Sequence, residues 1–179
     1  MVATDGELLD SVDVHVLVYD EELSYHPRPD LSHARYYEVT VFHIKPGHMA
    51  EWLEMVKMYK GACEKTKPDA HWAAYDVRYG AGGGTFVALT HLDSLAEVDK
   101  MVQWDDKFVE NIGGEDAVKK WEELSRDAID SSQSELFSIN PKQSYPEESW
   151  IKGDPDFWKP KKTAPEAASA KPAAKPTGN

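Results

Sequence analysis

Apolar and polar side chains alternate along residues 12–19 and 35–44 with the period of two that is typical of β-strands. In the second run, Tyr37, Val39 and Val41 point one way and the residues between them point the other. Three further short runs, 71–79, 85–91 and 134–140, are predicted strands as well. Gly80–Gly84 joins two of them, and glycine tolerates the positive φ that a tight hairpin requires.

Apolar residues take a helical spacing after Pro46 and Gly47, which predicts a helix over 48–65. The pattern Ser94-Leu-Ala-Glu97 is a capping box and predicts the start of a second helix. After an interruption at Gly113, a further helix is predicted over 115–130. The inner-face residues of the first helix are Trp52, Val56, Tyr59 and Cys63, and those of the second are Val98, Met101, Asp105, Phe108 and Ile112.

The predicted order between residues 35 and 140 is therefore β-α-β-β-α-β. This order is typical of the ferredoxin-like fold, an α+β arrangement in which a four-stranded antiparallel sheet carries its helices on one face. The strand at 12–19 is additional. Residues 10–27 resemble residues 130–146 at an offset of 120, so we interpret this N-terminal strand as the last strand of a truncated preceding repeat.

The chain is accordingly divided into three parts. Residues 1–34 are interpreted as the helix end, strand and loop of the preceding repeat, and 35–158 as one ferredoxin-like domain of the α/β-barrel type. Residues 159–179 are rich in Lys, Ala and Pro, a composition that buries no core and predicts disorder.

The charge of the chain is uneven. The net charge is −12, but residues 159–179 contain five Lys and one Glu and so carry +4, which leaves −16 for residues 1–158. Phosphate backbones and anionic lipid surfaces repel so acidic a body, and we therefore expect neither a nucleic acid nor a membrane as a partner.

Cysteine use and hydropathy bear on the compartment. The single cysteine, Cys63, allows no intramolecular disulfide, and its place in a helical stripe indicates a small buried apolar residue. No run approaches 18 apolar residues, so no transmembrane helix is predicted, and the acidic N-terminus is unlike a signal peptide. We expect a cytoplasmic protein, or a periplasmic or secreted one if a signal peptide precedes the missing first repeat.

The run from Arg35 to His48 resembles the second half of bacterial proteins that consist of two tandem ferredoxin-like domains. The helix after it, the segment His71-Trp-Ala73, the glycine-rich hairpin and the run Ser94–Asp99 are similar to the same proteins. They belong to the dimeric α/β-barrel superfamily, which includes antibiotic-biosynthesis-monooxygenase-like and NIPSNAP-like proteins. The resemblance covers about residues 5–150 and implies the fold and a barrel closed by a second sheet.

Strand alternation divides the sheet into two faces, and we expect one of them to pack on the helices. The residues expected there are Val39, Val41, Ala73, Tyr75, Val77, Val87 and Leu89. The opposite face mixes aromatic and polar side chains, and the resemblance implies that it meets the second sheet and lines a ligand cavity. The candidate ligand-binding residues on it are Thr40, Phe42, Trp72, Arg78, Phe86 and Thr90, and the candidate catalytic residues are Glu38 and Asp76.

The charged residues of that face allow two interpretations. In the functional one, Glu38, Asp76 and Arg78 converge in a cavity where burial shifts their pKa values. In the structural one, which we favour, Asp76 and Arg78 form an ion pair on one face at a dimer interface, since structural ion pairs perturb carboxylates as readily as catalysis does.

A metal site requires several ligands that converge. The hairpin brings His71 and His91 to the same end of the sheet, but no third ligand is evident and the sequence contains no His-Glu-x-x-His. The superfamily also includes haem-degrading oxygenases that use an Asn, a Trp and a His. Trp72 fits such a role, yet residues 1–110 contain no Asn, which argues against haem degradation. We expect no metal and no cofactor.

Two functions remain open. The first is a small-ligand-binding or assembly module, a homo-oligomer through the sheet face that encloses a small apolar or aromatic molecule. The alternative is a cofactor-independent monooxygenase or isomerase, with Glu38 or Asp76 as base and Trp72 and Phe86 holding an aromatic or apolar substrate. A catalytic carboxylate should have a raised pKa and an ion-paired one a lowered pKa. Because the strand at 12–19 exposes unpaired backbone unless it docks, deletion of residues 1–30 should lower solubility or change the oligomer.

Overall fold

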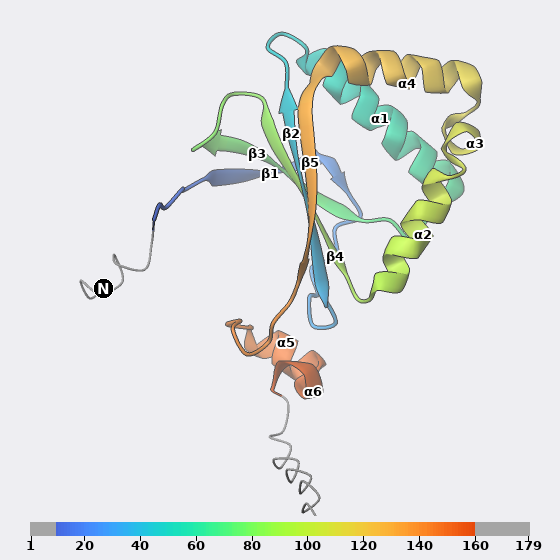
Figure 1. The fold of residues 1–179 in the computed structure, drawn as a ribbon. Coiled ribbons are helices and arrows are strands. Elements are labelled where there is room, and N and C mark those ends of the chain that lie inside the picture. The colour runs from blue at the N-terminus through green and yellow to red at the C-terminus, as the bar shows by residue number, and fades with distance from the viewer. Residues whose placement is uncertain (1–9, 160–179) are drawn as a thin grey trace, which may run out of the picture.

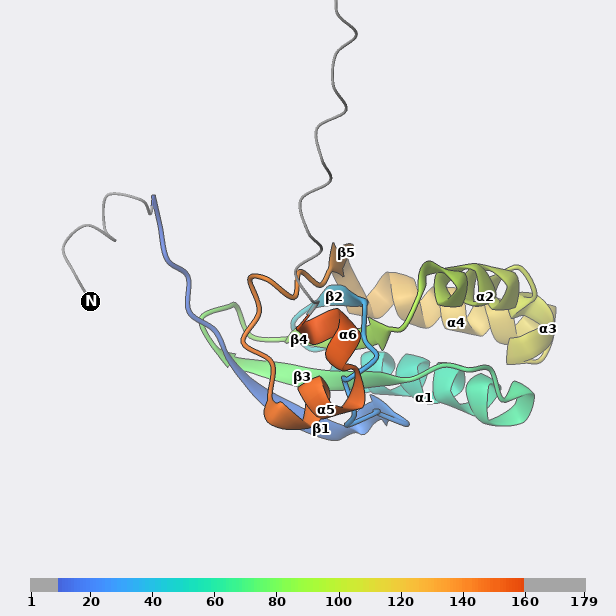
Figure 2. The ribbon, with the colours of Figure 1, turned by 90° about the horizontal axis from the view of Figure 1, so that it is seen from below.

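The computed structural model describes residues 10–159. A five-stranded antiparallel sheet carries α1, α2, α3 and α4 on one face (Figure 1; Figure 2). The strands are β1 (Val16–Tyr25), β2 (Tyr36–Ile44), β3 (Trp72–Tyr79), β4 (Thr85–Leu92) and β5 (Ile129–Ser138). The helices are α1 (Met49–Thr66), α2 (Leu95–Asp105), α3 (Phe108–Ile112), α4 (Glu115–Ala128), α5 (Glu148–Gly153) and α6 (Pro155–Trp158).

The order of the strands in the sheet is β1-β3-β4-β2-β5. Without β1, the order β3-β4-β2-β5 is the antiparallel four-stranded sheet of the predicted ferredoxin-like βαββαβ unit, so the α+β fold class is confirmed. The second predicted helix is divided into α2 and α3. Its start is confirmed, but the capping box does not form: the Ser94 side chain makes no cap bond, and the Glu97 carboxylate accepts a hydrogen bond from the backbone N–H of Asp93, one residue before the cap.

β1 is a strand of the same sheet, paired antiparallel with β3, and it continues to Tyr25. The prediction that the strand ends at residue 19 and a loop follows is therefore wrong. The reason is a local irregularity: the Asp20 carboxylate accepts from the backbone N–H of Leu23, and the Ser24 hydroxyl donates to the Asp20 carbonyl. The same hydroxyl accepts from the backbone N–H of Ala74, which ties the displaced strand back to β3.

The two segments that resemble each other in sequence do not share one structure along their length. At the offset of 120, β1 corresponds to residues 136–145, of which only 136–138 are strand. β5 begins at Ile129, directly after α4, whereas the predicted strand began at residue 134. The helix end predicted before residue 10 and the tail predicted from residue 160 lie outside the described residues.

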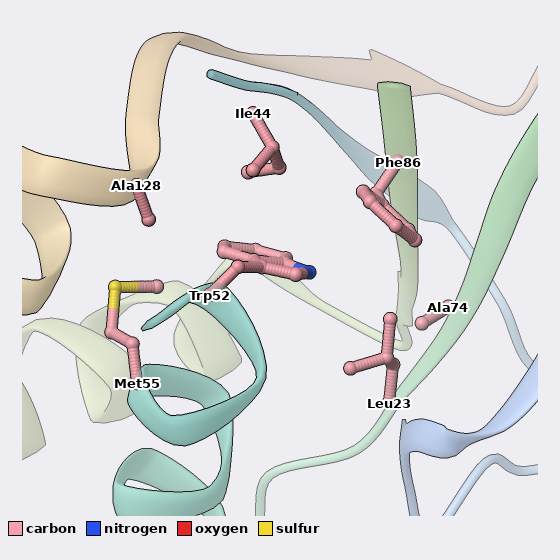
Figure 3. Packing of buried hydrophobic residues seen from close by; sticks show 7 residues of the cluster. All are labelled: Leu23, Ile44, Trp52, Met55, Ala74, Phe86 and Ala128. Carbon is pink, nitrogen blue, oxygen red and sulfur yellow. The ribbon is translucent and has the colours of Figure 1, made fainter. Parts of the chain in front are cut away.

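The core lies between the sheet and α1. Trp52 of α1 is 4% exposed, and its ring lies 5.7 Å from that of Phe86 (Figure 3). The ring of Phe42 lies 4.9 Å from that of Trp52. A buried aromatic ring removes a large apolar area from water, so these contacts anchor α1 to the sheet. The residues of the buried cluster are Leu23, Ile44, Trp52, Met55, Ala74, Phe86 and Ala128.

The assignment of the two sheet faces from the sequence is wrong: the faces are exchanged. Phe42, Ala74 and Phe86 pack against the helices, and the face expected there is left uncovered by α1–α4 (Figure 2). The uncovered face carries Val39, Val41, Ala73, Tyr75, Val77, Val87 and Leu89. Alternation fixes which residues share a face, but since both faces are largely apolar it does not say which one the helices cover.

The short helices α5 and α6 pack at the end of the sheet where β2 begins (Figure 1). The Trp158 indole N–H donates to the Ser32 carbonyl at 2.8 Å, and Arg35 forms an ion pair with Asp154. The Arg35 guanidinium also lies 3.8 Å from the centre of the Phe157 ring. Within residues 10–159, no helix has the length and apolar character needed to cross a membrane.

Candidate functional site

A cleft of about 380 Å³ lies between the helix-covered face of the sheet and helices α1, α2 and α4. Six aromatic side chains dominate its lining: Phe42, Trp52, Tyr59, Trp72, Phe86 and Trp121. Thr40, Thr90, Ser125 and Ser132 supply hydroxyl groups. Mostly apolar walls with a few placed polar groups are the usual construction of a small-molecule pocket.

The edge strand β5 borders the cleft through Ile129 and Ser132. Leu136 pairs with Glu38 and therefore points to the helix-covered side, yet it remains 49% exposed. Two positions earlier, the Ser134 hydroxyl lies 2.8 Å from the Thr40 hydroxyl. The hydroxyl groups of Ser132 and Ser134 therefore lie on the helix-covered side of the sheet.

Two indoles, Trp72 in the lining of the cleft and Trp104 outside it, are held by hydrogen bonds. The indole N–H of Trp72 donates to the Leu23 carbonyl at 2.8 Å, and that of Trp104 donates to the Thr66 hydroxyl at 2.9 Å. Tyr59 lies between these two indoles, with ring centres 5.7 Å and 5.3 Å away. The indole N–H groups of Trp52 and Trp121, which also line the cleft, are buried without a hydrogen-bond partner among the described residues, so they are unpaired donors beside it.

Two carboxyl groups with raised pKa values, Glu38 of β2 and Asp105 of α2, lie on the helix side of the sheet. Partial burial raises the pKa of Glu38 above its ordinary value, and the nearby Asp105 carboxylate raises it further. The pKa of Asp105 is also raised, by desolvation and then by Asp106, although Asp105 is an exposed residue. Burial is also the main reason why the pKa of Tyr59 is well above its ordinary value, with Cys63, Asp105 and Glu38 adding to it. Of these groups, the half-buried Glu38 is therefore the one whose raised pKa suits it to donate or accept a proton at the site.

Five of the six ligand-binding candidates line the cleft, namely Thr40, Phe42, Trp72, Phe86 and Thr90. They lie together because strand alternation places them on one face, and the exchange of faces turns that face toward the protein's own helices. The sixth, Arg78, is exposed near the end of β3 and pairs with Asp76 at 3.0 Å. The predicted ion pair is thus present, away from the lining of the cleft.

Glu38 does not converge with Asp76. Asp76 aligns with Phe86, which aligns with Phe42, so Glu38 is two strands away and four residues along the sheet. With ordinary strand spacing and rise this separates the two Cα atoms by roughly 16 Å. A catalytic pair of these two carboxylates is excluded, and Asp105 of α2 is the neighbour that Glu38 has instead.

Tyr59, Met101 and Trp121 complete the cleft, and the candidate list from the sequence omitted them. Each occupies an inner-face position of a predicted helix, where a core role is the ordinary interpretation. No local signal separates these three residues from ordinary core residues, because a helical apolar stripe predicts burial and not a cavity.

The predicted approach of His71 and His91 is confirmed. Their ring centres are 4.7 Å apart, and the two residues are 3% and 7% exposed. The His91 carbonyl lies 2.7 Å from Nε2 of His71, so Nε2 is the protonated nitrogen. Burial lowers the pKa of both rings. Among residues 10–159, no group of three or more His, Cys, Asp and Glu side chains is placed to hold a metal ion.

No protein-family model and no curated protein matches the chain. Solved structures of protein Atu4242 from Agrobacterium tumefaciens are similar in fold. One is 12% identical, with 59% of this chain and 93% of that chain covered and a TM-score of 0.42. The other, described as a NIPSNAP family protein with unknown function from strain C58, is 13% identical, with 64% and 94% covered and a TM-score of 0.41. NIPSNAP-like proteins are among those that the sequence resembles, and a likeness at this level carries no ligand, reaction or partner to the present chain.

Proposed function

We propose that the chain binds a small, mainly apolar or aromatic molecule in the cleft between the sheet and its helices. The observation that carries the proposal is the cleft of about 380 Å³ with its six aromatic and four hydroxyl-bearing side chains. Aromatic ligands pack on such rings in offset or edge-to-face geometry, which favours them over aliphatic ligands of equal size.

The polar groups give the ligand an orientation. Thr90 pairs with Glu38 across β2 and β4, so the two side chains point to the same side at one end of the cleft. With its raised pKa, the Glu38 carboxyl retains a proton at higher pH than an ordinary glutamate and can donate a hydrogen bond. A ligand with an apolar ring and one carbonyl or hydroxyl oxygen therefore fits with its ring toward Trp52 and its oxygen toward Glu38.

The test is a titration with 1-naphthol, followed by NMR on the indole N–H signals of Trp72 and Trp121. Ala88 lines the cleft, so Ala88→Phe should fill it and abolish the shifts. The matched control is Leu89→Phe, which adds a ring one residue later on the uncovered face. Undiminished binding to a folded Ala88→Phe chain would show that 1-naphthol binds elsewhere and would refute the proposal. Should that variant not fold, Thr90→Val removes a hydroxyl with little change of shape and should weaken the binding of naphthol more than that of naphthalene.

We also propose that the uncovered face forms a homo-oligomer. Tyr19 and Phe137, aligned with Tyr75 and Tyr37 respectively, are 47% and 50% exposed. Val39, Val41, Val87 and Leu89 lie on the same face, and Gln133 and Glu135 of the edge strand β5 border them. Two copies can cover such a mainly apolar face by a two-fold contact. A preceding copy of the domain, as the sequence repeat indicates, is the alternative source of a second sheet.

Sedimentation of a Tyr75→Lys chain tests this assembly. The substitution places a charge in the middle of the uncovered face and should convert a dimer into a monomer. Val18→Lys is the control, because Val18 aligns with Asp76 on the opposite side of the same sheet and is 45% exposed. A wild-type chain that sediments as a monomer at micromolar concentration would contradict the proposal.

The enzymatic alternative is favoured by one observation, the raised pKa of Glu38 beside the cleft. In a cofactor-independent isomerase or monooxygenase, the Glu38 carboxylate would remove a proton from a carbon or oxygen atom of the bound substrate. Isomerisation returns that proton to another atom, whereas oxygenation requires the substrate anion to react with O₂. NMR titration of Glu38, with Asp76 as the ion-paired reference, is decisive: a pKa at or below the ordinary value of 4.5 removes this alternative.

A further inference from the structure

A second hollow, of about 490 Å³, lies between the end of β5, residues 139–147 and the two short helices α5 and α6. Four of its lining side chains are aromatic, so we call it the aromatic groove: Tyr37, Tyr145, Trp150 and Trp158. Leu31 and Ile139 add apolar surface, and Asn140 and Gln143 add amide groups. None of these residues lines the cleft described above, so the two sites can be tested independently.

The groove has a fixed floor and an exposed wall. Trp158 is 4% exposed and is held by its indole N–H bond to Ser32, and the Trp150 ring packs against it with ring centres 5.7 Å apart. The turn before Tyr145 is closed by the Ser144 hydroxyl, which donates to the Asn140 carbonyl. Tyr145 itself is fully exposed, at 103%. An exposed ring on a hydrogen-bonded turn beside three further rings forms a surface for an extended ligand rather than part of a core.

We propose that the aromatic groove binds the proline-rich end of the same chain, from Pro160 to Pro176. This segment contains four prolines, namely Pro160, Pro165, Pro172 and Pro176. Extended proline-rich peptides bind between aromatic side chains, because the pyrrolidine rings pack on indole and phenol faces and little conformational entropy is lost. Their carbonyl groups need donors, which the Trp150 indole, the Tyr145 hydroxyl and the Gln143 amide supply.

Position and charge identify this segment as the occupant. Pro160 follows two residues after Trp158, which is itself part of the groove. Six residues in the polyproline conformation, at about 3.1 Å each, would span roughly 16–19 Å, which is enough to cross a hollow of this size. Attachment at the edge of the groove gives an effective concentration on the order of millimolar, so a weak contact suffices for occupancy. The segment 159–179 carries +4 and the rest of the chain −16, so attraction holds it close to the body.

The test uses the full-length chain with a nitroxide label attached through Ser169→Cys. The native thiol of Cys63 is 1% exposed and burial raises its pKa to about 11, so it does not compete for the label. The Trp150 indole and Gln143 amide signals should be broadened several-fold more than the backbone signal of Tyr79, which lies at the far end of β3. Equal broadening at Tyr79 and Trp150 would overturn the proposal.

Three variants assign the contact. Tyr145→Ala combined with Trp150→Ala should release the segment, and so should replacement of its four prolines by alanine, which keeps the charge. Tyr79→Ala is the matched control, since Tyr79 is another exposed tyrosine, at 71%, outside the groove. Broadening that survives in the proline-free chain would show that charge alone holds the segment, which refutes recognition of proline. Broadening that appears only in a mixture of labelled chains and isotope-enriched chains would assign the contact to a second copy and refute binding within one chain.

Discussion

Leu23→Ala tests whether β1 is an integral part of the fold. Leu23 is 4% exposed, belongs to the buried cluster with Trp52 and Phe86, and also lines the cleft. It reaches the core only because the chain is displaced between Asp20 and Tyr25, so its burial depends on that irregularity. Removal of its outer carbons should therefore destabilise the whole domain rather than β1 alone.

The magnitude follows from the groups removed. Three buried methyl or methylene groups at about 0.8 kcal/mol each give about 2.4 kcal/mol. The cavity left beside the rigid ring of Trp52 adds to this, so we expect a loss of roughly 3–4 kcal/mol in the free energy of unfolding. For a chain of this length each kcal/mol lowers the melting temperature by about 2–4 °C, which places the variant roughly 6–16 °C below the wild type.

The assay is urea unfolding, followed by tryptophan fluorescence and by far-ultraviolet circular dichroism. Leu17→Ala is the control, because Leu17 is on the same strand but 39% exposed, and it should cost less than about 1 kcal/mol. Coincident transitions for both probes, shifted in Leu23→Ala only, support a single cooperative unit. A loss of less than about 1 kcal/mol in Leu23→Ala, or a separate early transition, would refute the reasoning and show that β1 docks as an independent segment.

Three further outcomes are expected. Burial lowers the pKa of His71 and His91 below 6.5, so the unfolded chain takes up protons before the folded chain does as the pH falls. The melting temperature should therefore decrease from pH 7 to about pH 5, and His91→Gln should flatten that decrease. Gly84 has a φ of +79°, and an added Cβ would lie 2.9 Å from the Ile44 carbonyl oxygen, so Gly84→Ala should lower the free energy of unfolding in urea by roughly 1–3 kcal/mol. At Gly82 an added Cβ meets nothing within 4 Å, so Gly82→Ala should be near neutral. Glu38→Gln should raise the melting temperature at neutral pH, since it removes a carboxylate whose pKa burial raises, and the gain should disappear as the pH falls toward 4.5 and Glu38 becomes protonated.

The order of the elements was predictable because breaks such as Pro46 and the Gly80–Gly84 hairpin divide periods of two from periods near 3.6. The two faces could not be assigned in this way, since both carry valines or aromatic rings and either could have met the helices. Five ligand-binding candidates nevertheless lie together, because the grouping of residues on a face does not depend on which face is covered. Arg78 is the exception, as β3 extends past the helices at that end.

Other features depend on contacts that no local pattern encodes. The irregularity in β1 depends on the Ser24 hydroxyl meeting the backbone of Ala74, fifty residues away. The α6 helix has a local signal, Asp154 as N-cap followed by Pro155, which was missed because the helix has only four residues. The aromatic groove collects residues from 31 to 158, so only the folded chain brings them together.

The contacts that fasten α6 also determine how the domain bears a pulling force. The Trp158–Ser32 hydrogen bond joins positions 126 residues apart, and the Arg35–Asp154 ion pair joins positions 119 apart. Tension applied at the C-terminal end loads this link first, and only after it breaks does tension reach β5, an edge strand that can then peel away from β2 one residue pair at a time. The contacts of the two short helices should therefore break before the sheet does. A single-molecule extension curve should show a small first step, from the release of α6, before the sheet opens.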